Sequence, residues 1–244
     1  MVCKMLVCLM TTLKPHGVIA LRASPQSKMR ISFRHPPPTS LIGALAYPLF
    51  NGNRTEIVLN EYGKVKSKAD ELRSMLINVA LSSKKGLMYG PLFKINRLYH
   101  NTAESAVTSL PLNIIYGEAD YLYRIAYIFD KEKLTNYTLK DLERAAWGIT
   151  RLGSRESVVN VENVKTTRIE VSRVNVAKTF FSYSLDKVKN VRGKYDMELV
   201  VDWKNNEIGD YSRTDRIRLV YPLEENEVEG DLTIAVVNGE AIII

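Results

Sequence analysis

The segment from residue 22 to residue 30 combines cations with short polar side chains. Arg22, Lys28 and Arg30 fall within nine residues, together with two serines and a glutamine. Cations neutralise phosphates, whereas hydroxyl and amide groups can reach sugars and base edges. A solvated surface loop would have the same composition, so this segment alone leaves both interpretations open.

A second cationic segment, from residue 151 to residue 157, places a glycine between two arginines. Gly153, just past a predicted helix, can present free backbone N–H groups beside the guanidinium groups of Arg151 and Arg155. That combination binds phosphate well. The alternative is a helix C-cap in which Arg155 pairs with Glu156 or Glu162.

A run of three prolines, residues 36–38, separates the first cationic segment from a predicted helix. Such a run is stiff and cannot join a helix or a sheet interior. We therefore expect Thr39 or Ser40 to cap a helix that continues to about Phe50. The small pair Gly43 and Ala44 within it is expected to permit a close backbone approach. A helix N-terminus is itself an anion site.

Signatures of catalysis and of cofactor binding are missing. The chain has no phosphate-binding glycine loop, no dinucleotide glycine pattern and no Gly-x-Ser-x-Gly elbow. Cys3 and Cys8 have the wrong spacing for zinc, so we expect both to be buried and expect no metal or cofactor. His100, with Tyr99 and Lys94 nearby, could serve a metal-free ribonuclease because imidazole titrates near neutrality. We favour instead a solvated or RNA-contacting loop.

Charge is unevenly distributed along the chain. The sequence has 34 Lys and Arg against 27 Asp and Glu, a net charge of +7. Seven basic and no acidic residues precede Glu56, and six acidic and no basic residues follow Arg218. The excess of positive charge suggests an anionic partner such as nucleic acid. The acidic end is expected to lie away from that partner, as a solvated sheet edge or a face for a protein neighbour.

Composition excludes several protein classes. Hydrophobic residues make up 45% of the 244 residues and charged residues 25%, which describes a globular chain rather than a disordered one. Two cysteines cannot form a disulfide scaffold, and no apolar stretch approaches the ~20 residues that span a bilayer. We therefore expect a cytoplasmic protein without a membrane partner.

The hydrophobic pattern predicts an α+β fold. Strands are expected at 3–12, 54–62, 119–129 and 158–176, and helices at 39–50, 67–82 and 138–150. With residues 87–117 as an insertion, the order over residues 1–176 is the βαββαβ pattern of a ferredoxin-like or RRM-type domain. The aromatic RRM signature is absent. Residues 177–244 read as a β-rich C-terminal extension packed on that domain, which ends in a hairpin around Asn238-Gly239.

The run from Phe33 to Leu45 resembles the proline-rich start of the first helix in the fifth family of CRISPR-associated proteins. That family belongs to the RAMP superfamily of RNA-binding CRISPR proteins. The loop containing Pro25-Gln26-Ser27 sits where the family's first loop sits, and residues 151–157 resemble its Leu-Gly-x-Arg-Glu segment. The chain is most similar to the archaeal type I-A Cascade subunit.

The resemblance implies a non-catalytic RNA-binding subunit of a type I-A CRISPR surveillance complex (Cascade) in antiviral defence. Family members have a ferredoxin-like palm and a β-hairpin thumb, expected here within residues 86–117. They cap the 5′ handle of CRISPR RNA and contact the backbone subunit and other CRISPR-associated proteins, so that target DNA is met only through the complex. The residues that would contact RNA are Arg22, Gln26, Ser27, Lys28, Arg30, His35, Thr39, Ser40, Arg97, Tyr99, His100, Arg151, Gly153, Ser154 and Arg155.

One subtype of the family departs from this role. There the family member itself cuts repeat RNA, using a Tyr, a Lys and a His. The alternative function is therefore a metal-independent endoribonuclease that processes CRISPR repeat RNA. No convincing triad aligns in this sequence, so the resemblance implies binding and not cleavage.

Overall fold

A computed structural model describes most of the chain. The described residues are 5–16, 18–21, 23, 32–50, 58–61, 64–83, 92–96, 107–111, 113–114, 121–154, 156–186, 188–209 and 214–244. Only the backbone is described at 18, 58–61, 64–66, 92–96, 107–111 and 113–114. Within this part of the chain, no helix has the length and apolar character needed to cross a membrane.

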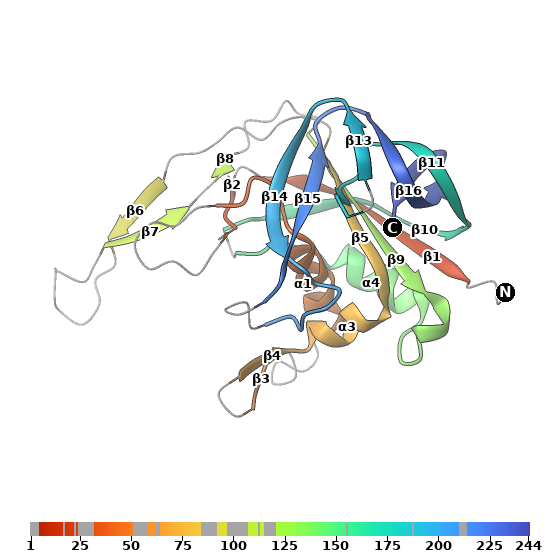
Figure 1. The fold of residues 1–244 in the computed structure, drawn as a ribbon. Coiled ribbons are helices and arrows are strands. Elements are labelled where there is room, and N and C mark those ends of the chain that lie inside the picture. The colour runs from red at the N-terminus through yellow and green to blue at the C-terminus, as the bar shows by residue number, and fades with distance from the viewer. Residues whose placement is uncertain are drawn as a thin grey trace.

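A four-stranded antiparallel sheet, which we call the palm sheet, forms the centre of the fold (Figure 1). Its strands lie in the order β10-β1-β9-β5. They are β1 (Leu6–Pro15), β5 (Leu76–Ser83), β9 (Tyr123–Asp130) and β10 (Val159–Ile169). With the helices α1 (Pro38–Leu49) and α4 (Leu139–Trp147), the order along the chain is strand, helix, strand, strand, helix, strand.

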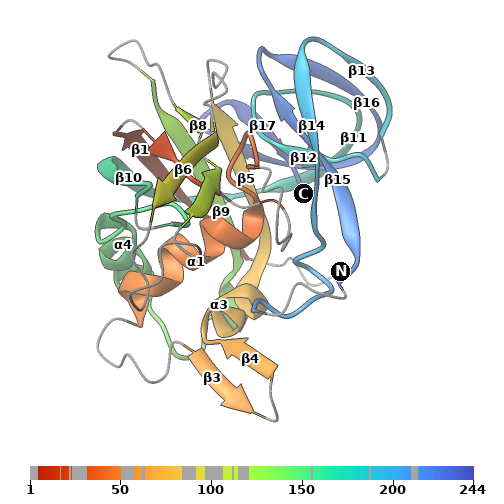
Figure 2. The ribbon, with the colours of Figure 1, turned by 90° about the vertical axis from the view of Figure 1, so that its left-hand side faces the viewer.

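The strands β1, β5 and β9 are largely buried on both faces, which explains why they are mainly apolar rather than alternating, whereas the edge strand β10 is polar and largely exposed. One face, including Leu9, Leu81 and Tyr127, packs with the residues of α1 and α4. The opposite face, including Cys8 and Ala126, packs against strands from the end of the chain. Figure 2 shows the helices and the C-terminal strands on opposite sides of the sheet. The predicted burial of Cys8 is confirmed, and Cys3 lies outside the described residues.

The region predicted as one helix over 67–82 is divided between two elements. Helix α3 (Ala69–Met75) ends after two turns, and β5 follows it directly. A short apolar run that is buried on both faces has no alternation, so periodicity cannot separate a helix from a strand there. The second strand of the palm sheet is therefore β5. The predicted strand at 54–62 belongs instead to a separate hairpin, formed by β3 (Val58–Glu61) and β4 (Lys64–Ser67).

The helix starts and ends also differ in detail from the sequence prediction. Thr138 caps α4 as predicted, in a capping box with Asp141. Helix α1, however, begins one residue before Thr39, with Pro37 at the N-cap and no side-chain cap. Proline is tolerated at the first helical position because its missing N–H would have no partner there.

A close backbone approach does occur between the two helices, although Gly43 is not the residue that permits it. A Cβ atom on Gly43 would meet nothing within 4 Å. Helix α4 ends at Gly148, rather than near Gly153, and a Cβ atom there would lie 2.8 Å from Cβ of Pro48. The crossing of α1 and α4 therefore depends on Gly148.

The predicted insertion contains a hairpin. Strands β6 (Leu92–Asn96) and β7 (Val107–Pro111) pair antiparallel, and β8 (Asn113–Ile114) pairs with β2 (Val18–Ile19). Figure 1 shows the β6–β7 hairpin projecting away from the palm sheet.

The C-terminal part is β-rich, as predicted. One sheet contains β11 (Val171–Thr179), β16 (Asn226–Val237), β13 (Val188–Arg192) and β17 (Glu240–Ile243). A smaller sheet has the order β12-β15-β14, with strands Tyr183–Ser184, Arg216–Pro222 and Tyr195–Val201. Asn238 and Gly239 form the predicted turn, both with positive φ. The predicted boundary at residue 176 falls inside β11.

Candidate nucleic-acid interface

A groove of about 180 Å³ lies between α1 and the loop that follows α4. Both helices pack on one face of the palm sheet, so the end of α4 brings this loop beside α1. The residues lining the groove are Ser40, Gly43, Ala44, Tyr47, Thr150, Arg151 and Gly153. The structure therefore brings together three of the predicted RNA-binding residues, Ser40, Arg151 and Gly153. No carboxylate is among the lining residues.

Arg151 supplies the positive charge of the groove. Its guanidinium carbon lies 4.6 Å from the ring centroid of Tyr47 in α1. Arg151 forms no ion pair with any carboxylate that the structure describes. A guanidinium that stacks on an aromatic ring keeps its fork of N–H donors for a planar anionic partner such as phosphate.

The loop after α4 is a tight turn that requires glycine. Gly153 has φ +80°, and a Cβ atom on it would lie 2.2 Å from Cδ2 of Leu21 and 3.9 Å from Oγ of Ser40. The N–H of Leu152 donates to the carbonyl of Ser157, which closes the turn. Among the described residues, the N–H of Gly153 finds no acceptor. Gly153 lines the groove, so its N–H is a candidate backbone donor there.

Ser154 contributes to the turn itself. Its hydroxyl lies 3.0 Å from the hydroxyl of Ser157, which in turn accepts a hydrogen bond from the N–H of Ala20 at 2.8 Å. These hydrogen bonds join the turn to Ala20, just before the cationic segment of residues 22–30, which we call the basic loop. The side chain of Ser154 thus has an internal partner in addition to its predicted contact with RNA.

The base of the basic loop lies at the same groove. The N–H of Phe33 donates to the carbonyl of Leu21 at 2.8 Å, and this bond joins the two ends of the segment 22–32. Because Leu21 packs on Gly153, the loop leaves the fold next to the groove. Nine predicted contacts lie outside the described residues: Arg22, Gln26, Ser27, Lys28, Arg30, Arg97, Tyr99, His100 and Arg155.

His35 has a different environment from the one that the sequence predicts. Its side chain is fully buried, with Nε2 3.0 Å from Oδ2 of Asp196 and its ring stacked on Tyr221 at 4.6 Å. RNA therefore cannot reach it in this structure, and the assignment of His35 as an RNA contact is corrected to an internal one. Thr39 and Ser40 remain half-buried.

The N-terminus of α1 has few free donors for an anion. Pro38 has no N–H, and the N–H groups of Ser40 and Leu41 both donate to the carbonyl of Pro37. The expected anion site at this helix start is therefore weak. The groove farther along α1 is the better candidate.

Two acidic residues of β14 hold the segment before α1, and no sequence motif indicated this role. Glu198 accepts hydrogen bonds from the backbone N–H groups of Arg34 and His35. Asp196 pairs with the guanidinium of Arg34 at 2.9 Å. The hydrogen bond from His35 lowers the pKa of Asp196, whereas burial raises the pKa of Glu198 to about 7. Alternation over residues 195–201 suggests acidic residues facing outward, which is the reverse of what the structure shows.

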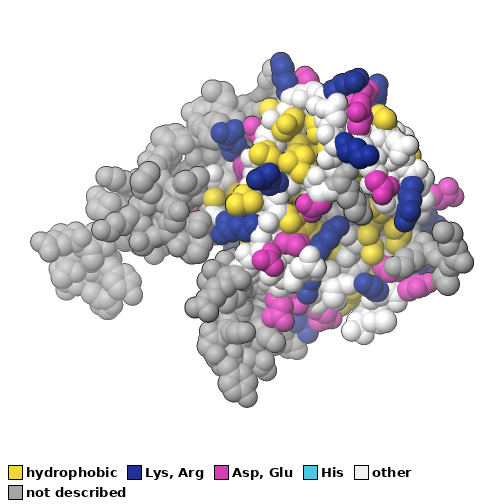
Figure 3. All heavy atoms as spheres, viewed as in Figure 1, with side chains coloured by type: hydrophobic (Ala, Val, Ile, Leu, Met, Phe, Trp, Pro, Cys, Tyr) yellow, Lys and Arg dark blue, Asp and Glu magenta, His cyan; other side chains and the backbone are white. Residues whose placement is uncertain are grey.

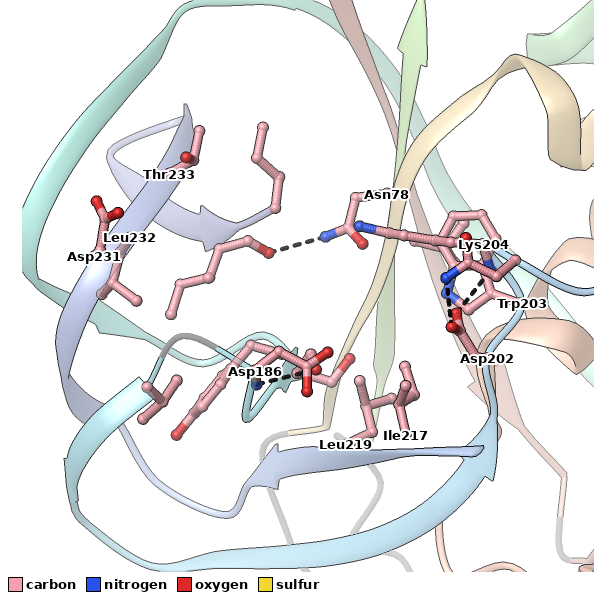
Figure 4. A pocket seen from close by; sticks show the side chains of 18 residues that line it. Asn78, Asp186, Asp202, Trp203, Lys204, Ile217, Leu219, Asp231, Leu232 and Thr233 are labelled. Atoms are coloured by element: carbon pink, nitrogen blue, oxygen red, sulfur yellow. Dashed lines mark hydrogen bonds between the residues drawn. The ribbon is translucent and has the colours of Figure 1, made fainter. Parts of the chain in front are cut away.

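A second cavity, of about 190 Å³, lies between β5 and the C-terminal sheets (Figure 4). Its polar groups largely satisfy one another: Asn78 donates to the carbonyl of Ile243, and Asn205 donates to Asp202. Asp186, Asp202 and Asp231 line it together with a single cation, Lys204. Carboxylates repel phosphate, so this cavity is not a candidate for RNA.

Comparison with known proteins gives relatives over nearly the whole chain. No protein-family profile matches it. The chain is 27% identical over 242 residues to "CRISPR-associated protein Cas5 3" of Saccharolobus solfataricus, and covers 96% of that protein. It is 28% identical over 243 residues to "CRISPR system aCascade subunit Cas5 1" of the same organism, again over 96% of its length. The chain resembles the Cas5 proteins. The resemblance predicted from the proline-led helix and the Leu-Gly-Ser-Arg-Glu segment is confirmed.

A solved structure shares the fold of this chain. The crystal structure of a CRISPR protein from Archaeoglobus fulgidus has a TM-score of 0.63 and 17% identity, and the match covers 97% of this chain and 98% of that one. The α+β architecture is therefore that of a known CRISPR protein.

Two glycines of the groove should respond oppositely to alanine. Gly153→Ala should lower the free energy of unfolding by about 2 kcal/mol, because φ is positive and Leu21 leaves no room for a Cβ atom. Gly43→Ala should raise it by roughly 0.5 to 1 kcal/mol, because the site is open and alanine favours a helix. Denaturant unfolding of both variants measures this, and equal destabilisation by the two would contradict the geometry.

Glu198 should make stability depend on pH. Its pKa is about 7 in the folded state and near 4.5 when unfolded, so the folded state binds more protons between these values and stability falls as pH rises through them. Glu198→Gln keeps one acceptor oxygen and removes the ionisation. The variant should gain stability relative to wild type between about pH 5 and about pH 8. The pKa of Asp196 is lowered, so its titration changes stability only below this pH range. A stability difference that does not change with pH would contradict the assignment.

Proposed function

We propose that the chain is a non-catalytic RNA-binding subunit of a type I-A CRISPR surveillance complex, Cascade, in which it caps the 5′ handle of CRISPR RNA. One of its relatives bears the name of an aCascade subunit, and this chain aligns with nearly all of it. The observation that supports RNA binding most directly is the groove between α1 and the loop after α4.

Each wall of the groove would contribute a different contact. Arg151, positioned by Tyr47, would bind a phosphate of the handle, and the N–H of Gly153 would donate to the same anion. The hydroxyl of Ser40 is placed to reach a sugar or a base edge. The basic loop emerges beside this site, so its cations would extend the contact along the RNA backbone.

The proposed role also gives the four-stranded sheet and the β6–β7 hairpin a place in the complex. We infer that the palm sheet is a ferredoxin-like palm, because its strand order and its helix placement fit that fold. We infer that the β6–β7 hairpin is the thumb, through which the protein would reach a neighbouring backbone subunit. Target DNA would then be met only through the assembled complex, in the cytoplasm.

A binding role without catalysis agrees with the position of His35. Its imidazole, which pairs with Asp196, is closed to RNA by burial. The side chains suspected for the alternative ribonuclease, those of Lys94, Tyr99 and His100, lie outside the described residues. A cleavage assay therefore has to separate the two functions.

Arg151→Gln should weaken binding to CRISPR RNA that carries its 5′ handle by about tenfold, because a charge-assisted contact is lost. Fluorescence anisotropy at one fixed salt concentration measures the affinity. Arg173→Gln is the matched control, because Arg173 is exposed on β11. The substitution removes the same charge at a position outside the groove. The control should change the affinity little.

The handle itself should account for the effect of Arg151. RNA without the handle should bind more weakly to wild type, and Arg151→Gln should change that weaker binding little. Equal affinity of wild type for both RNAs, or equal losses in the Arg151 and Arg173 variants, would contradict the proposed site.

Purified protein incubated with CRISPR repeat RNA in EDTA should leave the RNA intact. This expectation follows from the proposed binding role, since no catalytic triad aligns in the sequence and the buried imidazole of His35 is out of reach of RNA. Gel electrophoresis of the labelled RNA measures cleavage. A product cut at one site, and lost in His100→Ala, would instead establish the endoribonuclease.

A further inference from the structure

The side chain of Trp147, the last residue of α4, lies largely in solvent. Its exposed fraction is 55%, whereas that of Trp203, the second tryptophan of the chain, is 2%. Tryptophan has a large apolar surface and is highly buried on average in proteins. Among the described residues, no ring or cation stacks on the Trp147 indole, and no acceptor binds its N–H. A large part of this aromatic surface is therefore available to a partner.

Positive charge lies on the same face of α4. Lys140 and Arg144 precede Trp147 by seven and three residues, spacings that place side chains on one side of a helix. Both cations are exposed, and 85% of the Arg144 side chain is accessible. The ion pair of Arg144 with Asp141 is long, with 4.0 Å between Nη1 and Oδ1. A partner on this face would therefore need negative charge.

The two acidic residues of α4 have partners within the fold. Asp141 accepts hydrogen bonds from the backbone N–H and from the hydroxyl of Thr138, in the capping box. Glu143 accepts a hydrogen bond from the hydroxyl of Thr166 on β10. The cations therefore dominate the outer face of the helix.

The outer face of α4 continues into the groove. Gly148 ends the helix directly after Trp147, and the loop that follows supplies Thr150 and Arg151 to the groove wall. Arg151 follows Trp147 by four residues, and four residues span at most about 14 Å. A strand of RNA with one phosphate on Arg151 can therefore bring a neighbouring nucleotide over the indole.

We propose that Trp147 stacks on an unpaired base of the RNA that occupies the groove, while Arg144 and Lys140 bind phosphates of the same strand. This inference rests on the proposed function and adds a second contact surface to it. Exposed aromatic rings among cations bind single-stranded nucleic acid, because every base has an aromatic face and stacking does not depend on its sequence. The cations on both sides of Trp147, and its continuity with the groove, favour RNA over a protein partner.

The fluorescence of Trp147 tests the stacking directly, because a base that stacks on an indole quenches its emission. Saturating CRISPR RNA that carries its 5′ handle should lower the tryptophan emission of the wild-type chain. Trp147→Phe should abolish this loss, because the remaining tryptophan, Trp203, is buried. Trp147 is exposed, so the substitution leaves the core unchanged.

The affinity for the same RNA provides an independent measure. Trp147→Ala should weaken binding by about tenfold, and Trp147→Phe, which keeps an aromatic ring, should weaken it less. Neither substitution removes a charge, so the slope of log affinity against log salt concentration should stay the same. Arg144→Gln should instead reduce the magnitude of this slope by about one, because it removes a phosphate contact.

Tyr195→Ala is the matched control for the loss of an exposed aromatic ring. Tyr195 is 43% exposed on β14. Figure 3 shows hydrophobic side chains, with basic ones around them, over the region that β14 and β15 occupy in Figure 1. Figure 2 shows β14 and α4 on opposite sides of the molecule, so the control should change the affinity little. Circular dichroism and thermal unfolding confirm that each variant keeps the fold.

The outcomes separate this inference from the proposed function. Binding of the handle RNA without a loss of Trp147 emission would overturn the stacking and leave the RNA-binding role intact. Equal affinities of the Trp147→Ala and Tyr195→Ala variants would do the same, and would assign the exposed indole to a protein neighbour. Failure of the wild-type chain to bind the RNA at all would overturn the proposed function, and this inference with it.

Discussion

The carboxylates of Asp196 and Glu198 hold the segment before α1, and the position of α1 in the fold depends on that contact. The three prolines at 36–38 supply no N–H groups, and α1 has no side-chain cap. The position of the helix start is therefore set from outside the helix. Glu198 binds the backbone N–H groups of Arg34 and His35, and Tyr221 stacks on His35 and donates to the carbonyl of Pro36. Strands near the end of the chain thus fix the first helix.

The contact between β14 and the segment before α1 links the groove to strand β14. Helix α1 contributes Ser40 and Tyr47 to one wall of the groove, so the contact that positions α1 also positions the groove. The same strand, β14, carries these carboxylates on its inner side and the exposed side chains of Tyr195, Met197 and Leu199 on its outer side. The acidic end of the chain, after Arg218, forms ion pairs within the fold. Glu227 and Glu229 pair with Arg192, and Glu240 pairs with Arg124. Part of the negative charge is therefore neutralised within the fold.

The sequence predicted the elements that local chemistry specifies. The capping box of Thr138, the turn at Asn238 and the strand that becomes β9 all follow from short-range preferences. The division of residues 67–82 into α3 and β5 depends on burial against both faces, which periodicity does not report. His35 and Asp196 are 161 residues apart, and their contact comes only from the tertiary fold. Arg151, Gly153 and Ser40 were predicted separately, and only the packing of α1 with α4 showed that they share one groove.

The most direct test of the central claim is to find which residues touch the handle. CRISPR RNA with 4-thiouridine placed in its 5′ handle can be crosslinked to the full chain, and mass spectrometry then identifies the modified peptides. We expect crosslinks in α1 around Ser40 to Tyr47 and in the turn from Thr150 to Ser154, with further crosslinks in the adjoining basic loop. Crosslinks confined to other surfaces, with none to either wall of the groove, would contradict it.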